Sequence, residues 1–248
     1  MDEELKARNP WMDMTEENIA RCDKEFFGNK TPVKKYAEKI NGKFPAAELT
    51  FDCLPEPFSG NPDSQVYCLN MNPGKPDRCF DGDEDFRYAA LQNLALNSEG
   101  AFWTDKLVNK CGKTHDGVAW LDERTQDIGK VSEKYDDFDG VKDKNDIFFI
   151  EYFPYHSTKG FDFPNNLPSY DFSNALIVAA IAEGKTIIIM RKVAKWFERV
   201  PKLQTHCKKL YVLKFALGGY LSPNNIIRYE EYLKMKKRQG IIHNIVKL

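Results

Sequence analysis

Residues 66–77 read VYCLNMNPGKPD, an apolar run that stops abruptly at Asn-Pro-Gly. Asn, Pro and Gly are all turn residues, so a tight turn is the simplest interpretation of this stop. The loop at the carboxyl end of a buried parallel strand is, however, also the place where α/β proteins build ligand sites. The stretch alone leaves both interpretations open, and the rest of the chain has to decide between them.

Three later runs share this apolar character, and helical patterns separate them from one another. Together with residues 66–71 they form a set of four predicted strands, at 147–153, 186–190 and 209–215. Strands that are apolar throughout, instead of alternating, are typical of parallel strands buried on both faces. We therefore predict an α/β fold, a three-layer α/β/α arrangement around a four-stranded, mainly parallel central sheet.

The helical patterns have recognisable starts and stops. The pattern at 173–184 begins with Ser173 as a candidate cap and ends at Gly184, a residue that favours helix C-termini. The other patterns predict helices at 15–42, 81–97, 191–200 and 226–240.

A chain of 248 residues fits one large domain. We predict a single α/β domain over residues 1–248, with an N-terminal helical extension at 1–50. Residues 104–146 are charged and weakly periodic, so we interpret them as an insertion or lid between core elements.

Composition excludes several classes of protein. The first residues show no signal peptide, and charged residues interrupt the most apolar run, 175–190, so we expect no membrane partner. The 6 cysteines form no C-x-x-C pair, which argues against a zinc or iron–sulfur site and favours reduced thiols in the cytoplasm. No Gly-rich phosphate-binding motif follows a strand, so a nucleotide cofactor has no support, and our leading hypothesis includes neither metal nor cofactor.

The charge is distributed unevenly along the chain. Residues 151–248 hold 16 Lys and Arg against 7 Asp and Glu, whereas the preceding residues hold 20 against 30. A basic half is compatible with contacts to a phosphate backbone, although solvated helix faces explain it equally well. The candidate backbone contacts are Lys192, Lys195, Lys208 and Lys209.

Three loops, at 70–74, 153–157 and 218–225, follow predicted strands and should meet at one sheet edge. This layout resembles the uracil-DNA glycosylase superfamily, in particular its mismatch-specific and single-strand-selective branches and its poorly characterised bacterial members. The sequence LNMNPG is close to the Gly-Met-Asn-Pro-Gly form found there, and Ser222-Pro223 matches a weaker second motif.

The resemblance implies a glycosylase that extrudes a base and cuts its N-glycosidic bond. Asn72 would then position the attacking water, and His156 and Tyr220 would be the other catalytic candidates. Leu221 would be an apolar wedge that fills the gap left by the base. The base-binding candidates are Pro73, Gly74, Tyr155, Phe80, Ser222 and Asn224.

One departure from the family keeps other functions open. The second motif places Tyr220 where many members have His and some have Asn, and a tyrosine is not a cationic electrophile. The leading hypothesis is a DNA glycosylase-like hydrolase, acting as a monomer on single- or double-stranded DNA. The alternatives are a binding module of the same fold that recognises a base without cutting it, and an unrelated small-molecule α/β enzyme.

Overall fold

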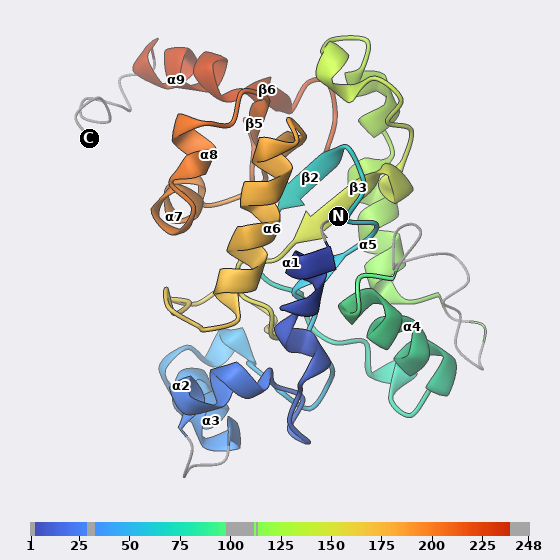
Figure 1. Ribbon diagram of the computed structural model, residues 1–248, viewed down its shortest axis with the longest axis vertical. Coiled ribbons are helices and arrows are strands. Elements are labelled where there is room, and N and C mark those ends of the chain that lie inside the picture. Colours follow the sequence, from blue (N-terminus) through green and yellow to red (C-terminus); the bar gives the residue numbers. More distant parts are fainter. Residues whose placement is uncertain (1–2, 29–32, 98–111, 113, 239–248) are drawn as a thin grey trace.

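The computed structural model describes residues 3–28, 33–97, 112 and 114–238, and its core is one six-stranded mixed sheet (Figure 1). The strands are β1 (Phe58–Ser59), β2 (Val66–Leu69), β3 (Ile147–Ile150), β4 (Thr186–Ile189), β5 (Leu210–Leu213) and β6 (Ile226–Arg228). Their order across the sheet is β1-β3-β2-β4-β5-β6. The four inner strands run parallel, and β1 and β6 pair antiparallel at the two edges.

The prediction of a four-stranded sheet is therefore wrong in its strand number. Strand β1 has only two residues, too few to show any periodicity. Strand β6 takes the first residues of the predicted helix at 226–240, because Ile226 and Ile227 pair with Leu213 and Val212 of β5. The helix itself begins at Tyr229.

Nine α-helices occur among the described residues, together with short 3-10 turns. They are α1 (Glu3–Ala7), α2 (Lys24–Phe27), α3 (Val33–Lys43), α4 (Glu84–Leu94), α5 (Asp116–Thr125), α6 (Tyr170–Ala182), α7 (Val193–Arg199), α8 (Lys202–Thr205) and α9 (Tyr229–Arg238). None of them is long and apolar enough to cross a bilayer.

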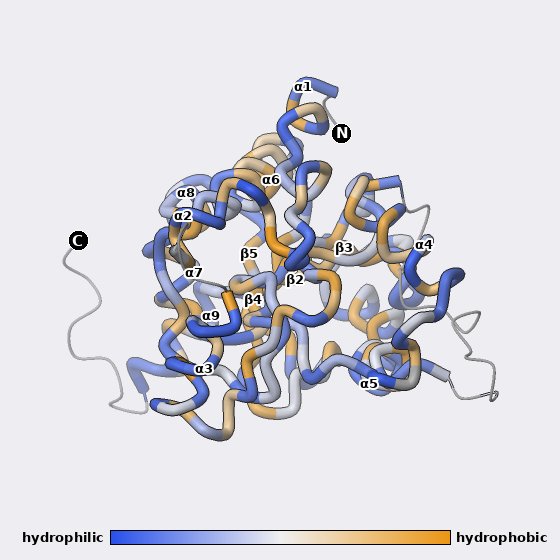
Figure 2. Tube along the Cα trace, turned by 90° about the horizontal axis from the view of Figure 1, so that it is seen from below, coloured by the Kyte–Doolittle hydropathy of each residue, from blue (hydrophilic) through white to orange (hydrophobic). Residues whose placement is uncertain are grey.

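Two hydrophobic cores lie on opposite faces of the sheet, because successive side chains of a strand point to opposite sides. On β2, Tyr67 and Leu69 join the core that includes helices α6, α7 and α8. Val66 and Cys68 join the second core, which includes α5. Figure 2 shows the apolar stretches of the chain gathered at the strands in the middle of the molecule.

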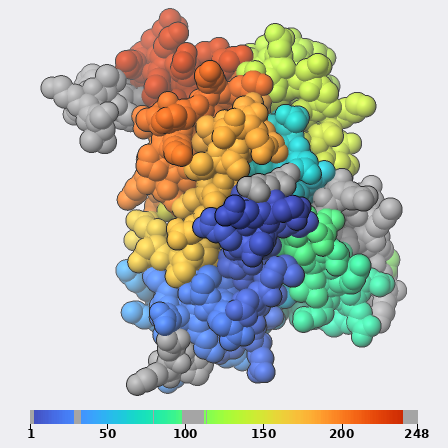
Figure 3. Space-filling view, in the orientation of Figure 1, coloured from blue at the N-terminus to red at the C-terminus, as the bar shows by residue number. Residues whose placement is uncertain are grey.

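The N-terminal extension is less regular than the predicted helix at 15–42. Asn18 adopts a left-handed backbone conformation (φ 56°), which ends any helix there, and residues 29–32 lie outside the described part. Buried Asp23 holds the extension in place, since its carboxylate accepts hydrogen bonds from the hydroxyls of Tyr155 and Ser169, both 2.7 Å away. Figure 3 shows the N-terminal residues lying over the centre of the molecule, between α6 and α4.

Two further predicted segments differ in detail. Helix α6 starts at Tyr170, so Ser173 is buried inside the helix instead of capping it, while Gly184 follows the helix end with φ 73°. The predicted insertion at 104–146 lies outside the described residues up to 111 and again at 113. Its described remainder buries Val118, Leu121 and other apolar side chains against the sheet.

Candidate functional site

A cavity of about 560 Å³ opens at the carboxyl ends of the inner strands. Asn70 directly follows β2, Glu151 directly follows β3, and Arg191 follows β4 by two residues, so the parallel topology brings three polar side chains to one edge. The volume lies within the range of small-molecule pockets. Further residues that line this cavity are Glu56, Asn72, Pro73, Gly74, Lys75, His115, Asp116, Trp120, Phe149, His156 and Lys159.

Asn72 is held in one orientation by its amide nitrogen. Its Nδ2 donates to the Ser157 carbonyl oxygen at 2.9 Å, to Ser157 Oγ at 3.0 Å and to the Pro73 carbonyl oxygen at 2.8 Å. Carbonyl oxygens only accept hydrogen bonds, so the amide cannot be turned round. No described residue donates to its Oδ1, which is left as an acceptor on a side chain that lines the cavity.

His156 is buried and has both ring nitrogens occupied. Nδ1 lies 3.0 Å from the Gly74 carbonyl oxygen, and Nε2 lies 3.2 Å from both the Leu54 carbonyl oxygen and Glu56 Oε1. Three acceptors around the two nitrogens favour the doubly protonated imidazolium. His156 therefore joins the loop after β2 to the loop before β1, and neither nitrogen is free for a base.

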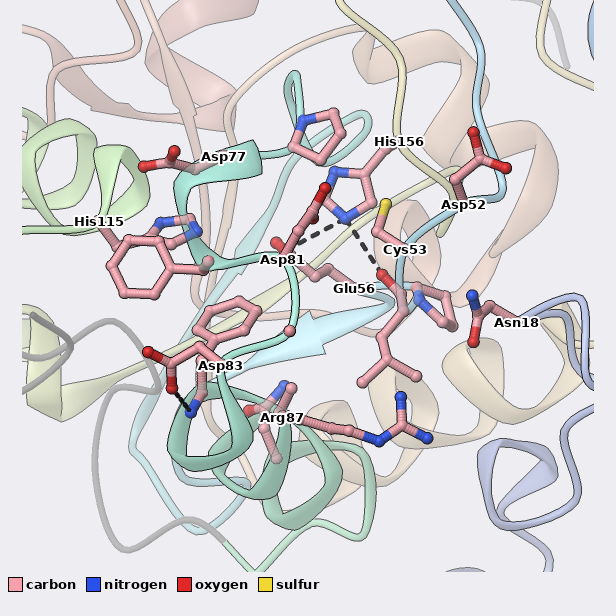
Figure 4. A pocket seen from close by; sticks show the side chains of 18 of the residues that line it. Asn18, Asp52, Cys53, Glu56, Asp77, Asp81, Asp83, Arg87, His115 and His156 are labelled. Atoms are coloured by element: carbon pink, nitrogen blue, oxygen red, sulfur yellow. Dashed lines mark hydrogen bonds and ion pairs between the residues drawn. The ribbon is translucent and has the colours of Figure 1, made fainter. Parts of the chain in front are cut away.

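The charge state of His156 agrees with this geometry. Burial alone lowers its pKa, but the Glu56 carboxylate and the hydrogen bonds to Cys53 and Glu56 outweigh burial and raise the pKa well above 6.5. Figure 4 shows Glu56 and Cys53 beside the imidazole ring.

Glu151 is a functional candidate that the sequence analysis missed. Its Oε1 accepts a hydrogen bond from Asn70 Nδ2 at 3.0 Å, whereas its Oε2 is buried and has no hydrogen-bond partner among the described residues. Burial is the largest cause that raises its pKa to about 8; Glu56 adds to the rise, and the hydrogen bond from Asn70 and the charges of Arg191 and His156 oppose it. The carboxyl group is therefore mostly neutral at pH 7.

A signal for Glu151 was present in the sequence. The predicted strand 147–153 is apolar except for one glutamate, and an ionisable side chain is rarely placed in an apolar strand unless it is paired. The strand in fact ends at Ile150, directly before Glu151.

Two further side chains complete the cavity. The Arg191 guanidinium donates to the carbonyl oxygens of Ala216 and Leu217, both at 3.2 Å, and so holds the loop between β5 and β6. Half-buried Trp120 on α5 lines the cavity, with the Arg124 guanidinium 5.5 Å from its ring centre. Trp120 and Phe149 are the aromatic residues that line this cavity, which has neither of the aromatic base-binding candidates, Tyr155 and Phe80, in its wall.

The structure does not bring the second sequence motif to this cavity. The Tyr220 hydroxyl donates to Glu123 Oε1 at 2.6 Å, and its ring lies against Arg124. Leu221 is fully buried in the second core, so it cannot act as a wedge. Ser222 and Asn224 do not line the cavity either.

The cause is a clamp within this loop. Asn225 is buried, and its side chain accepts from the Phe215 backbone nitrogen at 2.8 Å and donates to the Phe215 and Tyr220 carbonyl oxygens at 3.2 and 2.8 Å. These bonds hold the backbone of Tyr220 close to that of Phe215. The side chains of Phe215 and Leu217 in the same loop are 74% and 95% exposed.

Two aromatic candidates for base stacking have other surroundings. Tyr155 is buried in the first core, with ring contacts to Phe27 at 5.4 Å and Phe51 at 5.0 Å, and lines neither cavity. Phe80 packs against Phe86 and His115 in the wall of a neighbouring cavity.

That neighbouring cavity, of about 340 Å³, is shown in Figure 4 and is strongly acidic. Its carboxylates are Asp52, Glu56, Asp77, Asp81, Asp83 and Glu84. It shares Glu56, Pro76, His115 and His156 with the larger cavity, so the two are adjacent. In the described part of the chain, no three or more His, Cys, Asp or Glu side chains are grouped so that they could hold a metal ion.

The four candidate lysines lie at opposite ends of the parallel strands. Lys192 and Lys195 lie at the start of α7, just after β4, and Lys195 Nζ is 3.4 Å from Asp162 Oδ1. Lys208 and Lys209 precede β5, at the edge opposite the cavity. The basic residues that do line the cavity are Lys75, Lys159 and Arg191.

In comparisons with known proteins, no protein-family model, no curated protein and no solved structure matches the chain.

Proposed function

We propose that this protein hydrolyses the N-glycosidic bond of an extruded base in DNA, with a three-layer α/β/α fold of the uracil-DNA glycosylase type. The observation that carries the proposal is the fixed amide of Asn72. Its nitrogen is committed to Ser157 and Pro73, which leaves Oδ1 to hold a water molecule in a cavity at the carboxyl edge of parallel strands.

The reaction needs a water molecule close to the sugar and a polar environment for the departing base. As the glycosidic bond breaks, the sugar gains positive charge and the base gains negative charge. Asn72 would orient the water toward the sugar carbon. The positive charges of His156 and Arg191, both in the cavity wall, would favour the negative charge on the base.

The remaining elements of the proposal concern the partner. Lys75 and Lys159 are exposed at the cavity and suit the phosphates on either side of an extruded base. A monomer in the cytoplasm, without metal or cofactor, remains part of the hypothesis.

A binding module of the same fold is the second candidate. Both nitrogens of His156 are occupied, and Tyr220 is bonded to Glu123 outside the cavity, so neither predicted partner of Asn72 is free to act on a base. A site with only one of its three expected groups suits recognition without cleavage.

One experiment separates the two candidates. The purified protein is incubated with oligonucleotides that contain uracil, hypoxanthine or hydroxymethyluracil, and abasic sites are then cleaved with alkali. Strand breaks that disappear in Asn72→Ala but persist in Asn97→Ala, which changes an exposed amide three residues after α4, support the hydrolase. Retarded migration without breaks supports the binding module. If the protein neither breaks nor retards the oligonucleotides, the small-molecule enzyme is the remaining candidate.

A further inference from the structure

The Glu151 carboxyl group is the feature of the cavity that the proposed function does not yet use. It lies at the end of β3, in the wall that also contains Asn72, and its Oε2 is a buried polar atom without a partner among the described residues. A buried oxygen that lacks a hydrogen bond costs free energy, and the cost is far greater for a charged carboxylate than for a neutral acid.

The hydrogen bond from Asn70 decides which oxygen carries the proton. Asn70 Nδ2 donates to Oε1, so Oε1 acts as the carbonyl oxygen and the proton belongs on Oε2. The acid proton therefore sits on the oxygen that no described residue uses.

We propose that Glu151 is the proton donor of this site and protonates the base as it leaves. The inference rests on the proposed N-glycosidic hydrolysis and adds a general acid to it. Glu151 lines the cavity, so a rotation of its side chain that brings the buried Oε2 to the cavity surface would give the proton an acceptor on a bound base. It follows that the substrates include bases that leave poorly as anions and need a proton to depart.

The step balances in atoms and charge. The C–N bond breaks, and its electron pair stays on the base nitrogen while the Oε2 proton moves to the base. The water held at Asn72 Oδ1 bonds to the sugar carbon and loses one proton, which passes to the Glu151 carboxylate and restores the acid. The products are a free neutral base and an abasic sugar with a new hydroxyl group.

Several charged groups surround Glu151 and set the pH range over which it can act. Burial, the largest cause, raises the pKa of Glu151 and Glu56 adds to the rise, whereas the hydrogen bond from Asn70 and the charges of Arg191 and His156 lower it, which leaves the pKa at about 8. The other titratable groups of the cavity are Lys75, His115, Asp116 and Lys159. Below about pH 8 the acid is mostly protonated and able to donate.

The test is the pH dependence of base release. In the wild-type protein kcat/KM for an oligonucleotide with uracil or hypoxanthine should fall about tenfold per pH unit above pH 8. Glu151→Gln should be about 10²-fold or more slower at pH 7 and lack this fall, because an amide cannot transfer the proton. The matched control Glu198→Gln changes an exposed glutamate on α7 and should behave like the wild type.

A second variant moves the pH limb without removing the acid. Asn70→Ala deletes the hydrogen bond that lowers the pKa of Glu151, so the fall in kcat/KM should shift to higher pH. If Glu151 had only a structural role, Asn70→Ala could change the rate, but the fall in kcat/KM would stay at the same pH.

Infrared difference spectra between wild type and Glu151→Gln separate the possible failures, because they report the protonated carboxyl without any substrate. Absence of the acid band at pH 7 overturns the inference. If the acid band is present but base release does not fall above pH 8, the donor role of Glu151 is also overturned, while the proposed hydrolase remains. A band that is present while no base is released from any oligonucleotide refutes the proposed function and the donor role together.

Discussion

Replacing Glu151 by Gln should stabilise the folded protein at alkaline pH relative to acidic pH. In the unfolded chain the carboxyl titrates near 4.5, and in the folded protein its pKa is raised to about 8. Since one pKa unit corresponds to about 1.4 kcal/mol, the ionised side chain costs the fold about 5 kcal/mol once both states have lost the proton.

The sign follows from which state binds the proton more tightly. The folded state does, so the wild-type protein carries no penalty below pH 4.5, and the penalty grows as the pH rises from there toward 8. It should reach about 3 kcal/mol at pH 7 and level off near 5 kcal/mol above pH 8. The glutamine does not titrate, so its free energy of unfolding lacks this slope.

Urea unfolding of both proteins between pH 5 and pH 9, followed by circular dichroism, measures the effect. The quantity of interest is how the difference in free energy changes with pH, because the amide also leaves a group unpaired beside Asn70 at a constant cost of about 1–3 kcal/mol. Glu198→Gln is the control and should run parallel to the wild type. A difference that stays constant from pH 5 to pH 9 would refute a neutral Glu151.

Three further changes test the other contacts. Asn72→Ala should lower base release by about 10²-fold and also cost about 1–2 kcal/mol in urea unfolding, since its amide bonds Ser157 and does not merely face solvent; unaltered release would remove Asn72 from the site. Leu221→Ala should cost about 2–5 kcal/mol as a core cavity, and only an exposed wedge would leave the melting temperature unchanged. Because the pKa of His156 is raised, its contribution to stability is complete below pH 6.5 and is lost as the pH rises through the folded pKa. Glu56→Gln should therefore destabilise the protein most at pH 6 in urea titrations, and an equal loss at alkaline pH would contradict the imidazolium.

The positions of the inner strands could be predicted because buried parallel strands carry a local signal. Residues such as Val66–Leu69 are apolar on both faces, and this can be recognised without any knowledge of partners. The edge strand β6 could not be predicted in this way. The pattern of Ile226–Arg228 continues into the following helix, and these residues form a strand only because they pair with β5 in the folded protein.

The candidate site divides along the same line. The sequence by itself determined that Asn72, at the end of a buried strand and before a proline, would lie in a strand-end loop, because that depends on neighbours in the chain. Only the tertiary structure decided that Glu151 meets Asn70, that His156 is enclosed by Glu56 and backbone carbonyls, and that Tyr220 is drawn away. Burial, charge pairing and hydrogen bonding between distant segments set these outcomes, and they arise only when the chain has folded.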